Sequence, residues 1–225
     1  MPRLFRLQLL STHYQVCLKI STVCPLNALI RCLVIADPSS DPNGKPTYVG
    51  ESFDIAIYLE DKYPAPKYPT IFPPGTRAMQ KITSEHFIYE VGYSIAPITL
   101  QLTARAGFLD ERSHEYFNRT RADRLKKFAV MTQSESKLWG EIHDKWAAFG
   151  KQLDLNNGPN EQGPFVMGKQ MSFTDFAIGG MIHWLHRVDG EDASRWKNMS
   201  EWQGGRWAKL WVEIEKLEKN SPEVV

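Results

Sequence analysis

The stretch YVGESFDIAIYLEDKYP, residues 48 to 64, contains the junction that decides the fold. Apolar residues lead up to Gly50, and apolar side chains at helical spacing follow from Phe53. The pattern predicts a strand, a tight turn and the N-terminus of a helix, with Glu51 and Ser52 at the turn. Two interpretations stay open: Ser52 caps the helix, or the pair binds a ligand.

The chemistry of this pair suits the end of an α-amino acid. Free amides and the positive end of the helix dipole favour an anion such as a carboxylate, which the Ser52 hydroxyl can also bind. The Glu51 side chain supplies a partner for an ammonium group beside that carboxylate. A ligand that carries both groups would therefore fit the junction.

Strand patterns precede the junction and prolines follow it. CLVIA, residues 32 to 36, is typical of a buried strand, and TYVG, residues 47 to 50, returns antiparallel to it after a turn. Five prolines between residues 64 and 76 then mark an extended linker. We therefore predict an N-terminal domain over residues 1–66, a linker over residues 67–75 and a second domain over residues 76–225.

The second domain is predicted to be entirely helical. One helix is expected over about Thr76 to Ala106, with a kink at Pro97. Another begins at SFTD, residues 172 to 175, and is apolar on two faces, which is typical of the centre of a bundle. Ser172 and Asp175 have the spacing of an N-capping box, whose role is structural.

Composition limits the class of partner. The chain has 225 residues, and 27 basic against 26 acidic side chains give a net charge of +1, so no global field attracts nucleic acid or an acidic membrane surface. No apolar run approaches the length that spans a bilayer. The partners expected on these grounds are small molecules or proteins.

The cysteines and the first residues bear on the cellular location. Three cysteines, an odd number without the spacing of a disulfide framework, favour a reducing compartment such as the cytoplasm. The first 36 residues contain several basic side chains and no acidic one, which is the composition of a mitochondrial transit peptide. A mitochondrial location is therefore the alternative.

Two further groups have candidate chemistry beside a structural explanation. His183 and His186 are three residues apart, as two metal ligands can be, but the sequence offers no third ligand at a suitable spacing. Ordinary hydrogen-bonded histidines are favoured, and no metal is expected. Cys24 precedes Pro25 at a helix-compatible run, where a helix N-terminus lowers the pKa of a thiol; a buried, inert cysteine is the alternative.

The order of these features resembles the glutathione transferase family over about residues 32 to 225: the hairpin, ESFDIAIYLEDKYP, the proline linker, and SFTD at the start of a central helix. The segments EYFNRTRADRLKKF and WLHRVDGEDASRWKNMSEWQGGRWAKL are most similar to the fungal, ether-cleaving branch of that family. The resemblance implies an α/β thioredoxin-like N-terminal domain, an all-α helical-bundle C-terminal domain, and a homodimer that binds glutathione and acts in detoxification.

The resemblance also implies site residues. Glu51 and Ser52 take the positions that hold the γ-glutamyl end of glutathione. Cys32 takes the position whose backbone pairs with the cysteinyl part, and Leu33 stands where the family has a cis-proline. Because a cis bond before a residue other than proline costs about 3 kcal/mol, we expect this part of the glutathione site to be altered.

The first 31 residues depart from the family pattern, because they do not resemble the unit that carries the thiol-activating residue. Either the N-terminus is degenerate or a different segment has been translated, and Cys24 is the one candidate for the catalytic residue. Two functions follow. The first is a glutathione transferase that acts on a small hydrophobic electrophile beside Tyr89, Tyr93 and Pro97. The second is a non-catalytic, glutathione transferase-like scaffold or binding protein.

Overall fold

The computed structural model describes residues 17–18, 34–37, 44–156, 158, 162–190 and 192–220. The chain divides into two compact units. The first unit comprises Met1–Arg77 with Lys216–Val225, and the second unit comprises Ala78–Glu215. Each unit has its own hydrophobic core.

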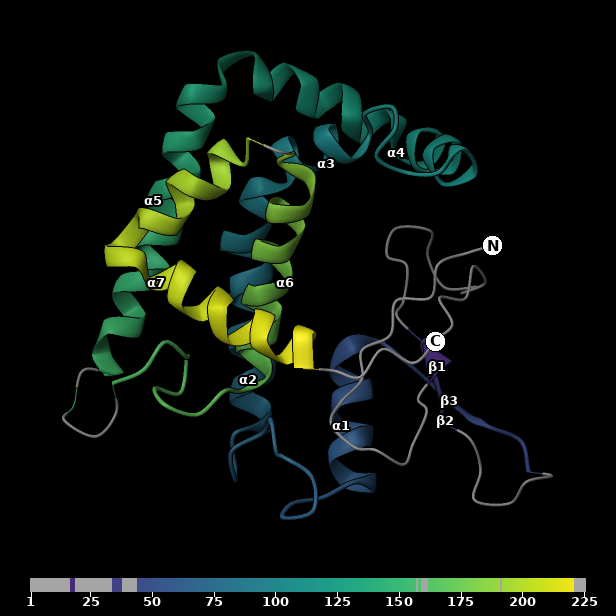
Figure 1. The fold of residues 1–225 in the computed structure, drawn as a ribbon, viewed down its shortest axis with the longest axis vertical. Helices are drawn as coiled ribbons and strands as arrows, with labels where there is room; N and C mark the ends of the chain where they lie inside the picture. The colour runs from purple at the N-terminus through teal and green to yellow at the C-terminus, as the bar shows by residue number, and fades with distance from the viewer. Residues whose placement is uncertain are drawn as a thin grey trace. The chain divides into compact units, whose positions relative to one another are not determined.

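The first unit contains a three-stranded antiparallel sheet in the order β1, β2, β3 (Figure 1). Its strands are β1 (Cys17–Leu18), β2 (Val34–Asp37) and β3 (Thr47–Gly50). The register places Val34 opposite Gly50 and Asp37 opposite Thr47. The strands β2 and β3 therefore form the predicted hairpin, and Gly50 is the last residue of its second strand.

Helix α1 (Ser52–Lys62) follows β3 directly. Its residue Ile55 packs with Ile35 of β2 in a small core, and Val49, Tyr58 and Leu59 surround the two. Only Ile55 and Ala56 of this helix are buried, so α1 is less enclosed than its many apolar residues suggest. The helix covers the sheet with one face, as an amphipathic helix does.

The proline-rich segment after α1 is tied to that helix. The Thr70 hydroxyl and the Ile71 N–H both donate to the Glu60 carboxylate, and Arg77 forms an ion pair with Asp61. The Phe72 ring is buried and meets the Phe53 ring edge-on at 5.4 Å. Side chains of α1 therefore give the extended segment a fixed path.

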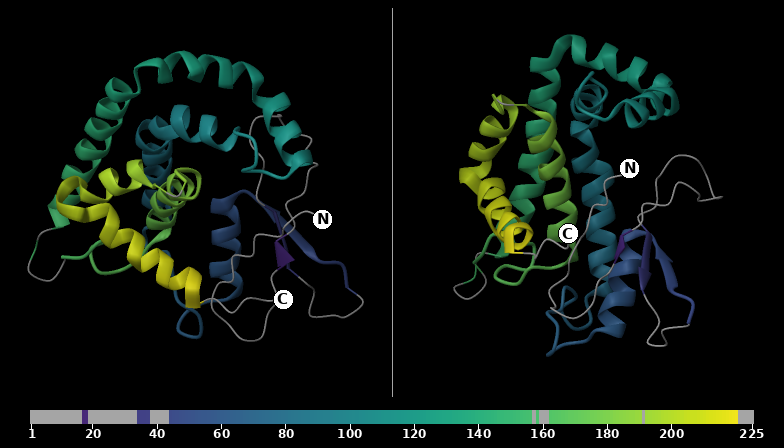
Figure 2. Two further views of the ribbon diagram at one scale, coloured as in Figure 1. Left: turned by 45° about the horizontal axis from the view of Figure 1, so that its top comes forward. Right: turned by 45° about the vertical axis from the view of Figure 1, so that its right-hand side comes forward.

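The second unit consists of helices and short helical turns (Figures 1 and 2). Two short 3₁₀ turns, Thr132–Ser134 and Asp154–Asn156, flank α5. The longer helices, in chain order, are α2 (Arg77–His86), α3 (Ala96–Thr103), α4 (Glu111–Met131), α5 (Glu135–Leu153), α6 (Phe173–Val188) and α7 (Ser194–Asn220). Helix α7 is kinked at residues 202–205, whose backbone is not helical, and its residues from Lys216 on belong to the first unit.

The core of the second unit is rich in aromatic rings. Trp146 lies edge-on to Trp207 at 4.9 Å and to Phe87 at 5.3 Å. Residues Ile178, Ile182 and Leu185 of α6 are fully buried against this group. Helix α6 thus occupies the centre of the bundle, where it lies against α3 and the two helical turns that precede α3.

The predicted long helix over residues 76 to 106 is interrupted earlier than expected. A π-helical turn at Phe87–Val91 and a 3₁₀ turn at Gly92–Ile95 separate α2 from α3. Pro97 lies in the first turn of α3, where its missing N–H costs nothing. The irregular backbone thus covers nine residues, 87 to 95, and its last four are those that a proline at position 97 is expected to disturb.

Candidate functional site

The turn between β3 and α1 presents the pair that the sequence singles out. Helix α1 begins at Ser52, and Glu51 occupies the N-cap position. The Glu51 side chain makes no capping hydrogen bond, and both residues are exposed. Ser52 is thus the first helical residue rather than the N-cap, so the interpretation of Ser52 as the cap is wrong.

The backbone of Glu51 is strained. Its φ of 68° and ψ of 130° lie in a region that favours glycine, and a side chain there costs roughly 1–3 kcal/mol. Such conformations gather at ligand clamps and other functional positions. The chain therefore places a carboxylate side chain at a position whose backbone conformation glycine would adopt at a lower energetic cost.

The end of α1 offers the chemistry of an anion site. The Ile55 N–H donates to the Glu51 carbonyl at 2.9 Å, which makes this the first intrahelical bond. The amides before Ile55 lie at the N-terminal end of the helix, where the dipole is positive. A carboxylate at these amides and an ammonium at Glu51 would both be stabilised.

A buried carboxylate anchors the far end of the same helix to the sheet. Asp37, at the end of β2, accepts hydrogen bonds from Tyr58 at 2.6 Å and Tyr63 at 3.1 Å and forms an ion pair with Lys62 at 3.2 Å. Burial opposes ionisation of Asp37, but these hydrogen bonds outweigh it and lower the carboxyl pKa. The same burial and the Asp37 carboxylate raise the pKa of Tyr63 to about 12.

The other proposed glutathione contacts, Cys32 and Leu33, and the catalytic candidate Cys24 lie outside the described residues. The part of the site that the structure describes is therefore the β3 to α1 turn.

The capping residues of the second unit surround the start of α6. The Ser172 N–H and hydroxyl each donate to Asp175 Oδ2 at 2.8 Å, and the Val166 N–H donates to Oδ1 at 2.8 Å. Burial raises the pKa of the Asp175 carboxyl to about 6, although the three hydrogen bonds oppose that shift. The role of this group is to close a buried helix end.

Gln80 completes the same helix end, and sequence reasoning missed it. Its Oε1 accepts from the Thr174 N–H at 2.9 Å and from the Thr174 hydroxyl at 2.7 Å. Gln80 is only 2% exposed. In the sequence, Gln80 looks like an ordinary polar residue of an amphipathic helix, so nothing indicated that it binds Thr174.

His183 and His186 pack against tryptophan rings. His186 lies 5.5 Å from the Trp211 ring and 5.7 Å from the Trp196 ring, and His183 lies 5.4 Å from Trp211. Among the described residues, no three histidine, cysteine or carboxylate side chains gather as a metal ion requires.

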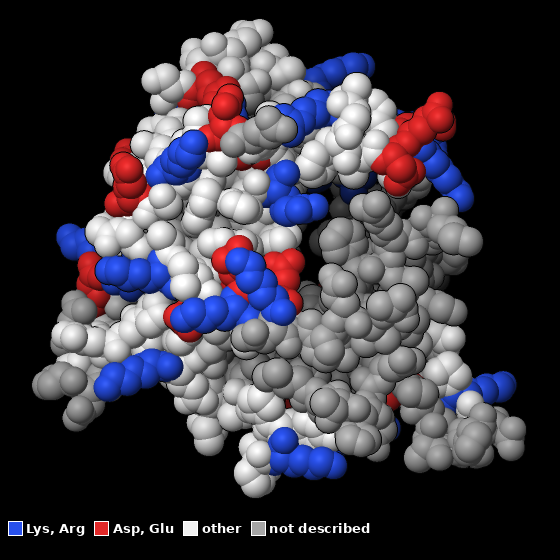
Figure 3. Space-filling model, viewed as in Figure 1, with Lys and Arg blue, Asp and Glu red and all other residues white. Residues whose placement is uncertain are grey.

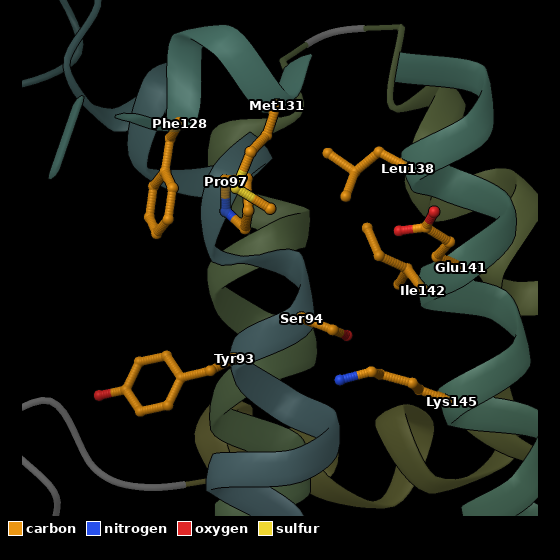
Figure 4. A pocket seen from close by; sticks show the side chains of 9 residues that line it. All are labelled: Tyr93, Ser94, Pro97, Phe128, Met131, Leu138, Glu141, Ile142 and Lys145. Atoms are coloured by element: carbon orange, nitrogen blue, oxygen red, sulfur yellow. The ribbon is translucent and has the colours of Figure 1, made fainter. Parts of the chain in front are cut away.

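A cavity of about 200 Å³ lies between the 3₁₀ turn 92–95 with α3, the end of α4 and the first half of α5 (Figure 4). Tyr93 and Pro97, two of the residues predicted beside the electrophile, lie in its wall. Tyr89 does not line it; this residue is 59% exposed, and its ring stands 6.1 Å from the ring of Tyr93.

Charged side chains of both signs lie mixed over the described part of the face in Figure 3. Within the residues that the structure places, no helix combines the length and the apolar character needed to cross a bilayer.

Two sequence comparisons relate the chain to glutathione S-transferases. The family model described as "Glutathione S-transferase, C-terminal domain" matches residues 78–217. The chain is 26% identical over 187 residues to the glutathione S-transferase-like protein ustS of Aspergillus flavus. That match covers 79% of this chain and 63% of the relative, so the chain spans less than two thirds of the length of that protein.

Solved structures of fungal glutathione transferases have a similar fold. The glutathione S-transferase CsGST63524 of Ceriporiopsis subvermispora, crystallised in complex with glutathione, has a TM-score of 0.69 and 30% identity, over 86% of this chain and 72% of that one. The glutathione transferase GSTFuA3 of Phanerochaete chrysosporium has a TM-score of 0.68 and 29% identity, over 86% and 70%. The predicted fold class is thereby confirmed, and the chain belongs to the glutathione S-transferase family.

Proposed function

We propose that this protein binds glutathione at the β3 to α1 turn and transfers it to a small electrophile. The observation that carries the proposal is the strained Glu51 beside Ser52 at the start of α1. In this assignment the γ-glutamyl carboxylate binds the first-turn amides and the Ser52 hydroxyl, and its ammonium pairs with Glu51. The structure of CsGST63524 in complex with glutathione, at 30% identity, supports the choice of ligand.

The reaction assigned to the protein is a nucleophilic substitution or addition by the thiolate of glutathione. The sulfur forms a bond to carbon. In a substitution the leaving group departs with the electron pair of the bond that breaks; in an addition the electron pair of the π bond moves to the neighbouring atom, which then takes a proton from solvent. The proton of the thiol passes to solvent when the thiolate forms. The residues of this chain that serve the step are those that hold glutathione and orient its thiol.

The finer assignments belong to the same proposal. The electrophile is a small aromatic compound, such as an aryl ether, held beside Tyr89, Tyr93 and Pro97. The similarity of two segments to the fungal ether-cleaving branch supports this substrate class. The protein acts as a homodimer in the cytoplasm, in detoxification.

Binding of glutathione to purified variants tests the site. Glu51→Gln removes the charge that pairs with the ammonium while it keeps the side-chain size, and we expect at least about ten-fold weaker binding by calorimetry. Adding Ser52→Ala to Glu51→Gln is expected to weaken glutathione binding more than Glu51→Gln alone. Asp54→Asn is the matched control, because Asp54 is an exposed acid in the first turn of the same helix and is expected to leave the affinity within about two-fold.

Turnover is measured with glutathione and 1-chloro-2,4-dinitrobenzene, a generic aromatic electrophile. The proposal expects conjugation by the wild type and a raised KM for glutathione in Glu51→Gln. Glutathione binding that survives Glu51→Ala with Ser52→Ala would overturn the site assignment. Binding without any conjugation would overturn the transferase assignment and leave the site standing.

A further inference from the structure

Helix α1 runs back along the hairpin that it follows. The turn at Glu51 marks one end of the paired strands, and Asp37, the last residue of β2, lies at the other end. Between these ends each strand advances three residues, or about 10 Å. Over the same length the helix advances from Ser52 to Tyr58, or about 9 Å. A shift of α1 along the sheet would therefore alter the turn and the contacts of Asp37 together.

Apolar packing alone gives α1 little positional control. Only Ile55 and Ala56 of the helix are buried, and Ile55 shares its small core with Ile35 of β2. Hydrophobic contacts are not directional, so a core of this size permits the helix to turn or slide on the sheet. A directional contact is needed to fix the position of the helix.

Asp37 supplies that contact. Its carboxylate accepts hydrogen bonds from Tyr58 and Tyr63 and pairs with Lys62, and the residue is only 2% exposed. The Lys62 ammonium also donates to the Tyr58 oxygen at 3.3 Å, so two of the donors are linked to one another. Hydrogen bonds to an ionised group are roughly twice as strong as those between neutral groups. Three such contacts from one end of α1 fix both its rotation and its position along the sheet.

The strained backbone of Glu51 depends on a helix that is fixed in this way. A residue in a sparsely populated conformation keeps it only where the surrounding structure leaves no alternative. The strand pairing fixes Gly50 before Glu51, and Asp37 fixes α1 after it.

We infer that Asp37 is a positioning residue for the glutathione site. It holds α1 so that Glu51 keeps its φ of 68° and its carboxylate stays where the ammonium of glutathione binds. This inference rests on the proposed function, which assigns the ammonium to Glu51.

Glutathione binding by Asp37→Asn tests the inference. The amide is neutral and accepts at one oxygen only, so the anchor is weakened, and we expect at least about five-fold weaker binding by calorimetry. With 1-chloro-2,4-dinitrobenzene, the KM for glutathione should rise by a similar factor, while kcat at saturating glutathione stays within about two-fold. Tyr58→Phe removes one hydrogen bond and keeps the ring, so it should give a smaller loss of the same kind.

A double-mutant cycle with Glu51→Gln shows whether Asp37 acts through Glu51. In the Glu51→Gln background, Asp37→Asn should weaken glutathione binding by less than about two-fold, because the charge that Asp37 positions is already gone. Equal losses from Asp37→Asn in the two backgrounds would overturn the inference.

Gln80→Ala is the control for a general loss of stability. The hydrogen bonds of Gln80 go to Thr174 of the second unit, so this variant should leave the affinity for glutathione within about two-fold. A loss of affinity as large as that of Asp37→Asn would show that instability alone weakens binding, and the inference would fail. Circular dichroism of each variant verifies that the helices are intact.

A measurement without glutathione separates this inference from the proposed function. While Asp37 holds the strained turn, Glu51→Gly should resist urea better than Glu51→Ala. In an Asp37→Asn background that difference should fall by at least half, because the turn can relax. An undiminished difference would overturn the inference even if glutathione binds. A diminished difference in a protein that binds no glutathione would support the hold of Asp37 on the turn and overturn only the proposed function.

Discussion

Gln80 of α2 closes the N-terminus of α6 by accepting two hydrogen bonds from Thr174, although 94 residues separate them in the chain. The amide N–H of Thr174 lies in the first turn of α6, where no intrahelical acceptor exists. Both residues are buried, so water cannot replace the Gln80 oxygen. The contact therefore satisfies donors that would otherwise oppose the burial of this helix end.

Replacement of Gln80 should destabilise the second unit. Gln80→Ala leaves the Thr174 N–H and hydroxyl without their acceptor, and we expect a loss of about 2 kcal/mol in the free energy of unfolding. Urea unfolding followed by circular dichroism measures it. Gln133→Ala, at an exposed position in the turn between α4 and α5, should change the value by less than about 0.5 kcal/mol. Similar values for the two variants would contradict the role of Gln80.

Asp175 should make stability depend on pH. Its pKa of about 6 in the folded state lies above the ordinary value of 3.8, so the folded state holds a proton between pH 4 and 6 that the unfolded state has released. The stabilisation is complete below pH 4 and is lost as the pH rises through 6, by up to about 3 kcal/mol for this shift.

The variant Asp175→Asn isolates that dependence, because its side chain does not titrate. The unfolding free energy of the wild type minus that of Asp175→Asn should fall between pH 4 and pH 7, since other carboxylates titrate in both proteins and cancel. Urea unfolding at four pH values gives the difference. A difference that is constant or that rises over this range would refute the raised pKa.

Substitutions at Glu51 should reveal its backbone strain. Glycine adopts a positive φ without a steric penalty, so Glu51→Gly should be more stable than Glu51→Ala by about 1 kcal/mol. At Asp54, an ordinary helical position, the order should reverse, with the alanine variant the more stable by up to about 1 kcal/mol. The four unfolding free energies test both signs, and the same order at the two positions would rule out strain at Glu51.

Gly92 should resist a larger side chain. A Cβ atom there would lie 3.0 Å from the Met181 Cγ and 3.2 Å from the Phe87 Cε1, so Gly92→Ala should lower the unfolding free energy by about 1–3 kcal/mol. The cost should shrink in a Met181→Ala background, where the nearest clash is gone. Gly140→Ala on α5 meets no atom within 4 Å and should be neutral or stabilising by up to about 1 kcal/mol. Equal effects of the two glycine substitutions would contradict close packing at Gly92.

The sequence predicts best those contacts that lie within a few residues of one another. The spacing of Ser172 and Asp175 is enough to suggest a capping box, because both partners belong to one turn of helix. The same holds for the Gly50 turn before Ser52, where strand and helix patterns meet. Gln80 could not be predicted in this way, because its partner is remote in the chain and no periodicity marks a buried glutamine.

The break between α2 and α3 shows a second limit. Proline is the strongest local signal of a kink, and the 3₁₀ turn at Gly92–Ile95 lies in the residues just before Pro97, as that signal predicts. The π-helical turn at Phe87–Val91 lies farther from the proline, next to Gly92, which packs closely against Met181 of α6. The proline therefore accounts for the end of this irregular stretch and gives no signal of its start.

The closure of α6 couples the stability of two helices that are distant in the sequence. Its first turn is completed by Gln80 from α2 and by Asp175, which also binds the Val166 N–H of the preceding loop. A peptide that begins at Ser172 would lack the first and the last of these partners, and a single helix of 16 residues is at most marginally stable in water. A stable α6 therefore depends on residues about 90 positions earlier, so α2 and α6 are expected to unfold together.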